Sequence, residues 1–99
     1  MPTSKEYLEY ILEQLRDIKY ISYKPMMGEY LLYKNNVLFG GIYDNRLLVK
    51  KTKSSDNYEL REVFPYPGAK SMYLIEEVEN IELISEIIDG IIKNLSKGK

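Results

Sequence analysis

Residues 24–51 read KPMMGEYLLYKNNVLFGGIYDNRLLVKK. Two short polar pairs, Asn35-Asn36 and Asp44-Asn45, divide this stretch into three apolar runs. Asparagine and aspartate tolerate the positive φ that tight hairpin turns need, so each pair predicts a turn between two strands. Turns this short force neighbouring strands to run antiparallel. We therefore expect an antiparallel sheet built on this stretch and covered by the rest of the chain.

Proline and glycine residues interrupt the strand pattern at three places in this stretch. Pro25 cannot donate to a sheet ladder, so it should lie at a strand end, in an edge strand or at a bulge. Gly28 allows a bend before the strand that starts at Glu29. The pair Gly40-Gly41 indicates a bulge or a helix packed closely on the sheet, which we favour, or a shallow floor for a ligand or partner backbone.

The segment before the sheet has the spacing of an amphipathic helix. Apolar residues recur three and four positions apart from Tyr7 to Ile18, with charged residues between them. Thr3 followed by Glu6 matches the capping-box pattern of a helix start. We predict a helix over residues 4–17 that packs its apolar side on the core.

The segment after the sheet predicts a loop, a final strand and a final helix. Ser54 or Ser55 is expected to cap a short helix that ends near Leu60. Residues 72–75 have the composition of a strand, and Asn80 suits the N-cap of the last helix.

The last helix carries a broad apolar stripe from Ile81 to Leu95. Gly90 lies inside the stripe and indicates either tight packing or a local weak point. Because the stripe is wider than one sheet face needs, we leave a homodimer open. Residues 96–99 are expected to fray.

Composition excludes several classes of function. The 99 residues allow one domain, which we expect to span residues 1–99. Their net charge of −1 gives no overall positive field to attract nucleic acid, so we expect no direct nucleic-acid binding. Histidine and cysteine are both absent, which excludes Ser-His and Cys-His nucleophilic catalysis. We expect no metal, no cofactor and no enzymatic activity. Without a secretory signal or a long apolar run, we expect a cytoplasmic protein with no membrane contact.

Several runs of the sequence occur in a recognisable order. They are Lys24-Pro25-Met26-Met27-Gly28-Glu29-Tyr30, Leu38-Phe39, Tyr43-Asp44-Asn45-Arg46-Leu47 with Lys50, and the later Pro65-Tyr66-Pro67-Gly68-Ala69-Lys70-Ser71-Met72. Together with the opening helix, their order and spacing resemble the N-terminal domain of the TfoX/Sxy family. These proteins are bacterial regulators associated with natural competence and transcription.

The resemblance implies a two-layer α+β fold, in which an antiparallel sheet packs against N- and C-terminal helices, similar to type III secretion chaperones. Full-length regulators of the family carry a second, C-terminal helical domain. We expect this chain to be a stand-alone copy of the N-terminal domain. Met27 stands where the family commonly has Phe, and the resemblance supplies no catalytic residues.

Two functions follow as hypotheses. The first is a non-enzymatic regulatory or adaptor module that contacts a protein partner. The second is a small-ligand or enzymatic site, with Glu29 as acid or base and Lys70 as an anion anchor. The candidate surface comprises Lys24, Met27, Gly28, Glu29, Tyr43, Arg46 and Lys70.

A basic cluster lies near the end of the predicted sheet. It comprises Arg46, Lys50, Lys51 and Lys53. These residues indicate either a small anion or nucleic-acid patch or, as we favour, an edge strand protected from aggregation by charge.

Overall fold

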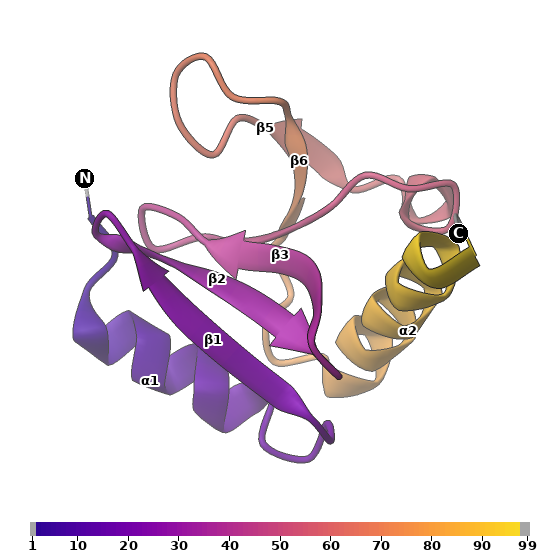
Figure 1. The fold of residues 1–99 in the computed structure, drawn as a ribbon, viewed down its shortest axis with the longest axis horizontal. Coiled ribbons are helices and arrows are strands. Elements are labelled where there is room, and N and C mark those ends of the chain that lie inside the picture. Colours follow the sequence, from indigo (N-terminus) through magenta and orange to yellow (C-terminus); the bar gives the residue numbers. More distant parts are fainter. Residues whose placement is uncertain (1, 98–99) are drawn as a thin grey trace.

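The computed structural model describes residues 2–97. Its elements in chain order are α1 (Lys5–Gln14), β1 (Ile21–Met26), β2 (Glu29–Lys34), β3 (Val37–Ile42), β4 (Leu47–Val49), the 3₁₀ helix η1 (Ser55–Tyr58), β5 (Arg61–Val63), β6 (Met72–Ile75) and α2 (Ile81–Lys97) (Figure 1). The strands form one six-stranded sheet in the order β1-β2-β3-β4-β6-β5, with every neighbouring pair antiparallel. The predicted α+β class and antiparallel sheet are confirmed.

Three tight turns connect the first four strands. The predicted pairs Asn35-Asn36 (φ 53° and 67°) and Asp44-Asn45 (φ 53° and 56°) both have positive φ. Met27-Gly28, between β1 and β2, is a third such pair (φ 52° and 86°). Two consecutive positive φ angles match the right-handed twist of hairpin strands, so the turn residues determine the pairing of β1 to β4.

The double glycine lies at a bulge in β3. The register passes from Leu32 opposite Gly40 to Tyr33 opposite Leu38, so Phe39 is the extra residue and is fully buried. A Cβ on Gly40 would lie 2.1 Å from the Leu48 carbonyl oxygen of β4. The bulge interpretation is confirmed, and the close neighbour of Gly40 is strand backbone rather than a helix.

Both helices pack on the same face of the sheet. One buried cluster joins α1, the sheet and α2, and contains Leu8, Ile11, Leu15, Ile18, Leu32, Phe39, Ile42, Leu47, Val49, Ile75, Ile84, Ile87, Ile88 and Ile91. The alternate strand positions Leu31, Gly41, Leu48 and Leu74 are paired with one another across four strands. Because side chains alternate along a strand, these residues belong to the second face, away from the helices.

The first helix starts and ends differently from the prediction. Ser4 is its N-cap, and Ser4 Oγ accepts a hydrogen bond from the Tyr7 N–H at 3.1 Å. The predicted capping box at Thr3 is therefore wrong, since Thr3 is buried and its hydroxyl donates to Glu29. The α-helix ends at Gln14 instead of residue 17, although the following turn still buries Ile18.

The second half of the chain contains one strand that was not predicted. β5 pairs with β6 and forms the far edge of the sheet, while Pro25 lies in the edge strand β1, as expected. The short helix predicted near Ser55 is a 3₁₀ helix of four residues. The predicted cap at Asn80 is confirmed, because Asn80 Oδ1 accepts from the Leu83 N–H at 3.2 Å.

The wide apolar stripe of α2 packs within this chain. Four isoleucines are fully buried, and Leu83, Ile92 and Leu95 lie partly buried against the same cluster. The tight packing predicted at Gly90 is confirmed, since a Cβ there would lie 2.0 Å from Ser54 Oγ. α2 continues through Lys97, and residues 98–99 of the predicted frayed tail lie outside the described residues. Within residues 2–97, no helix is both long and apolar enough to cross a membrane.

Candidate functional site

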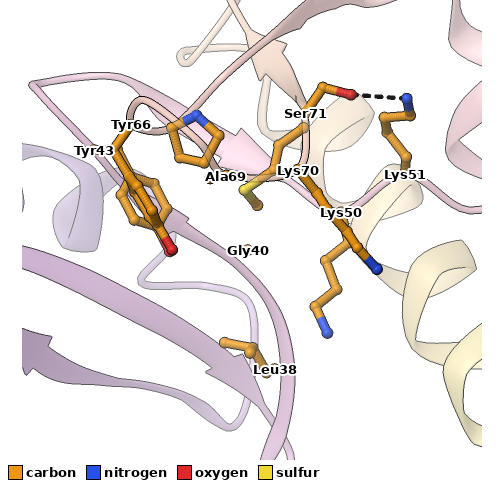
Figure 2. Close-up of a pocket in the computed structure, with 11 residues that line it drawn as sticks. Leu38, Gly40, Tyr43, Lys50, Lys51, Tyr66, Ala69, Lys70 and Ser71 are labelled. Carbon is orange, nitrogen blue, oxygen red and sulfur yellow. Dashed lines mark hydrogen bonds between the residues drawn. The ribbon is translucent and has the colours of Figure 1, made fainter.

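A cavity of about 760 Å³ opens on the second face of the sheet. Leu38, Lys50 and Met72 line it. Leu38 of β3 and Met72 of β6 occupy alternate strand positions that point away from the helices, and Lys50 directly follows the buried Val49 at the end of β4. The connection between β5 and β6, residues 64–71, forms the opposite wall, to which Pro65 and Ala69 contribute. Figure 2 shows Ala69 beside Tyr66 on this wall. In Figure 1 this connection is the orange loop that lies above β3. The volume lies within the range typical of small-molecule sites.

Arg46 anchors the connection that forms this wall. Its guanidinium Nη2 donates to the carbonyl oxygens of Phe64 (3.2 Å) and Pro65 (3.3 Å). Its Nε donates to the Tyr43 carbonyl oxygen at 3.1 Å. Pro65 is buried, so hydrogen bonds and apolar contact both hold the connection against the β3–β4 turn.

Lys51 is neutralised at the edge of the cavity. Its ammonium donates to Ser71 Oγ at 2.9 Å, the bond drawn in Figure 2, and to Glu62 Oε2. The same carboxylate accepts from Ser71 Oγ. These hydrogen bonds, that from Lys51 first, lower the pKa of Glu62. These hydrogen bonds among Lys51, Glu62 of β5 and Ser71 connect β5 to the start of β6.

Two further lysines in the cavity have no such partner. Within residues 2–97, the ammonium groups of Lys50 and Lys70 make no hydrogen bond or ion pair. Their side chains extend toward the same side of the cavity in Figure 2. Among residues 2–97, no aspartate or glutamate lines the cavity. The cavity is therefore a local concentration of positive charge in a chain of net charge −1.

A pair of tyrosines forms the other end of the cavity. The rings of Tyr43 and Tyr66 lie 6.3 Å apart between centroids, at 49° to each other. Tyr43 is buried and its ring lies over Gly41, while Tyr66 is 52% exposed at the rim. Burial, and then the proximity of Tyr66 and Glu29, raise the pKa of Tyr43. Beside the rim, Phe64 is 63% exposed.

The structure divides the predicted surface into two groups. Tyr43 and Lys70 line the cavity and Arg46 supports it, whereas Lys24, Met27, Gly28 and Glu29 do not line it. Met27 lies at the tip of the β1–β2 turn and is 97% exposed.

The Glu29 carboxylate has a structural set of partners. Its Oε1 accepts from the Thr3 hydroxyl (2.8 Å), the Thr3 N–H (3.2 Å) and the Asp44 N–H (3.0 Å). These bonds tie the N-terminal segment to the β3–β4 turn. The geometry therefore does not support a shared pocket in which Glu29 acts on a ligand anchored by Lys70.

The interpretation of the basic cluster as edge protection is wrong. β4 lies inside the sheet, between β3 and β6. Arg46 and Lys51 instead hold the cavity wall, and Lys50 lies in the cavity. The sequence showed the charges together, but β4 is only three residues long and nothing local indicated that β6 would pair with its free side.

Comparison with known proteins shows that the chain is similar to a spirochaete protein. The chain is 32% identical over 80 residues to an "uncharacterized 12.7 kDa protein in trpE 5'region" of Spirochaeta aurantia. The match covers 79% of this chain and 70% of that protein. No protein-family model and no solved structure matches the chain.

Proposed function

Since this chain belongs to the same family as the uncharacterized 12.7 kDa spirochaete protein, we propose a function from the geometry of the cavity face. The protein is a non-enzymatic regulatory or adaptor module that acts by contact with a protein partner. The resemblance of residues 24–51 and 65–72 to the N-terminal domain of TfoX/Sxy regulators supports this class. So does the antiparallel sheet with helices at both ends of the chain.

The observation that carries the proposal is a pair of exposed aromatic side chains, one at the cavity rim and one beside it. Phe64 and Tyr66 flank the buried Pro65, and Arg46 fixes the backbone between them. Aromatic residues are enriched at the centres of protein interfaces, where a rigid ring buries much apolar area at a small entropic cost. The β5–β6 connection therefore presents a preorganised contact surface.

The available residue types support a role without catalysis. The sequence contains no histidine or cysteine. Three donors already occupy Glu29, the carboxylate that the sequence suggested as an acid or base. Lys50 and Lys70 remain as binding groups.

Photocrosslinking in the native cells tests the adaptor function. A photoreactive residue in place of Phe64 is expected to form an adduct with one discrete protein, and Tyr66→Ser should reduce that adduct. The same photoreactive residue in place of Tyr20, which is 71% exposed between α1 and β1, is the matched control. Identical adducts at residues 20 and 64, or none at residue 64, would refute a partner at this face.

A second function, the binding of a small ligand, is favoured by a different observation. The cavity has the volume of a ligand site, mostly apolar walls and two lysines without partners. Sites of this kind combine an apolar lining with a few polar groups that orient the ligand. This function depends on Lys50 and Lys70, whereas the adaptor function depends on Phe64 and Tyr66.

A further inference from the structure

We infer that the cavity binds a small organic anion, a carboxylate or phosphate carried on a flat apolar group. Lys50 and Lys70 hold the anionic group, and the tyrosine end with the apolar wall holds the body. This inference rests on the small-ligand function proposed above and specifies its ligand class.

The distribution of charge selects an anion. The sequence has 15 acidic and 14 basic residues, yet of the residues that the structure describes, three lysines and no carboxylate line the cavity. Glu62 neutralises Lys51, which leaves two like charges on one concave surface. Two ammonium groups on the same surface repel each other, and a bound anion replaces this repulsion with attraction to both. Low-dielectric walls strengthen the field that attracts it.

The type of cation suits either a carboxylate or a phosphate. A lysine ammonium is a compact charge on a flexible stem, and it does not demand the planar two-point geometry that arginine favours. Arg46, which supports the cavity wall, donates its guanidinium hydrogen bonds to backbone carbonyl groups. The site therefore recognises negative charge and leaves the shape of the anionic group open.

The apolar lining of the cavity indicates a ligand with an apolar part, and not an inorganic ion alone. Leu38, Pro65, Ala69 and Met72 line the cavity beside the tilted pair of rings. The cavity of about 760 Å³ is far larger than the roughly 30 Å³ that a water molecule occupies in the liquid. A flat group of one or two rings would cover this surface. A nucleic-acid backbone is a poorer match, because two free lysines neutralise few phosphates.

Amide NMR with three probes tests the inference. 1-Naphthoate supplies charge and rings, 1-naphthamide supplies the rings without charge, and inorganic phosphate supplies charge alone. Naphthoate is expected to shift the amide signals of residues 38–43 and 64–72 and to bind about tenfold more tightly than either other probe, because a hydrogen bond to a charged group is worth about that factor.

Matched charge variants assign the binding to the two lysines. Lys50→Gln and Lys70→Gln should each weaken naphthoate about tenfold. Lys70→Arg, which keeps the charge, should retain binding. Lys53→Gln makes the same charge change at an exposed residue outside the cavity, and should leave the affinity unaltered. The dispersed spectrum of each free variant confirms that it is folded.

The outcomes separate this inference from the function on which it rests. If naphthamide binds in the cavity as tightly as naphthoate, the small-ligand function stands and the anion is refuted. If phosphate binds as tightly as naphthoate, the apolar body is refuted. If no probe shifts a cavity amide, or if the Lys50 and Lys70 variants bind like Lys53→Gln, the inference fails. A cavity that no probe enters also counts against the small-ligand function, while the adaptor function keeps its own test.

Discussion

At the scale of single residues, Gly90 is the position where α2 has no room for a side chain. A Cβ there would lie 2.0 Å from Ser54 Oγ and 3.0 Å from Ser54 Cβ. The Ser54 N–H donates to Asn94 Oδ1 of the same helix at 2.8 Å, so the Ser54 backbone is held in place. We expect Gly90→Ala to lower the free energy of unfolding by about 1–2 kcal/mol, since overpacking outweighs the better helix propensity of alanine.

Urea unfolding measures this change, and a second substitution identifies its cause. Ser54→Gly removes both atoms that the new methyl group would meet. In that background, Gly90→Ala should cost nothing or stabilise the protein. Lys93→Ala, on an exposed position of the same helix, is the control and should change stability little. An equal cost of Gly90→Ala in both backgrounds would show that the contact with Ser54 is irrelevant.

Glu29 acts as a structural acceptor, which leads to a second prediction. Glu29→Ala removes the carboxylate that accepts from the Thr3 hydroxyl, the Thr3 N–H and the Asp44 N–H. The Thr3 N–H and hydroxyl keep alternative acceptors, the carbonyl oxygens of Gly28 (3.0 Å) and Ile42 (3.3 Å). We expect a loss of about 1–3 kcal/mol in the free energy of unfolding, and a smaller loss for Glu29→Gln, whose amide oxygen still accepts. Urea unfolding measures both variants. The affinity for naphthoate should be unchanged in both variants. A loss of affinity at unchanged stability would show that Glu29 takes part in ligand binding.

At the scale of elements, the β5–β6 connection is ordered by one side chain from the β3–β4 turn. Arg46→Ala removes three hydrogen bonds to carbonyl oxygens. We expect the amides of residues 64–71 to exchange hydrogen faster while β2 and α2 keep their protection. The free energy of unfolding should fall by about 1 kcal/mol, because the guanidinium is only partly buried.

Arg61→Ala is the control for this loop effect. It removes the same charge from β5, where Arg61 forms an exposed ion pair with Glu76 at 3.9 Å. Exposed pairs contribute little, so exchange in residues 64–71 should stay as in the unaltered protein. Equal acceleration in both variants would mean that charge, rather than the hydrogen bonds of Arg46, orders the connection.

The strands and turns also show which features of the fold depend only on residues that are neighbours in the sequence. Turns such as Asn35-Asn36 could be predicted because the required φ angles depend on the turn residues themselves. β5 could not, because its three residues are mostly exposed and its pairing depends on distant groups such as Lys51 and Ser71. The cavity was hidden for the same reason, since Lys50 and residues 65–71 meet only after β6 inserts beside β4.

At the scale of the whole molecule, the absence of histidine and cysteine determines how stability depends on pH. No side chain with an ordinary pKa between those of the carboxyl groups and about 8.5 is present. We expect the free energy of unfolding to be nearly constant across neutral pH. The free energy of unfolding should fall at acidic pH and at alkaline pH, because specific side chains have different pKa values in the folded and unfolded states.

The acid limb follows from Glu62, whose pKa the hydrogen bond from Lys51 lowers in the folded state. The unfolded chain therefore takes up this proton first as the pH falls. The contribution is complete above the ordinary carboxyl pKa of about 4.3 and is lost as the pH falls through the folded value. Glu62→Gln should flatten this limb in urea unfolding measured against pH. An acid limb of unchanged slope would show that other carboxylates are responsible.

The alkaline limb follows from the tyrosines, of which the sequence has ten. Burial raises the pKa of Tyr7 and Tyr43, and the hydrogen bond to Asp56 raises that of Tyr73. The unfolded chain releases these protons near the ordinary value of about 10, while the folded chain retains them. The stabilisation is therefore complete below about pH 10 and is lost as the pH rises through the folded values. Ultraviolet titration of tyrosinate should show a late-ionising group that is absent in urea, and Tyr43→Phe should remove part of it. If all ten tyrosines titrate together in the folded protein, the ring of Tyr43 is not enclosed, and the tyrosine end of the cavity is open to solvent.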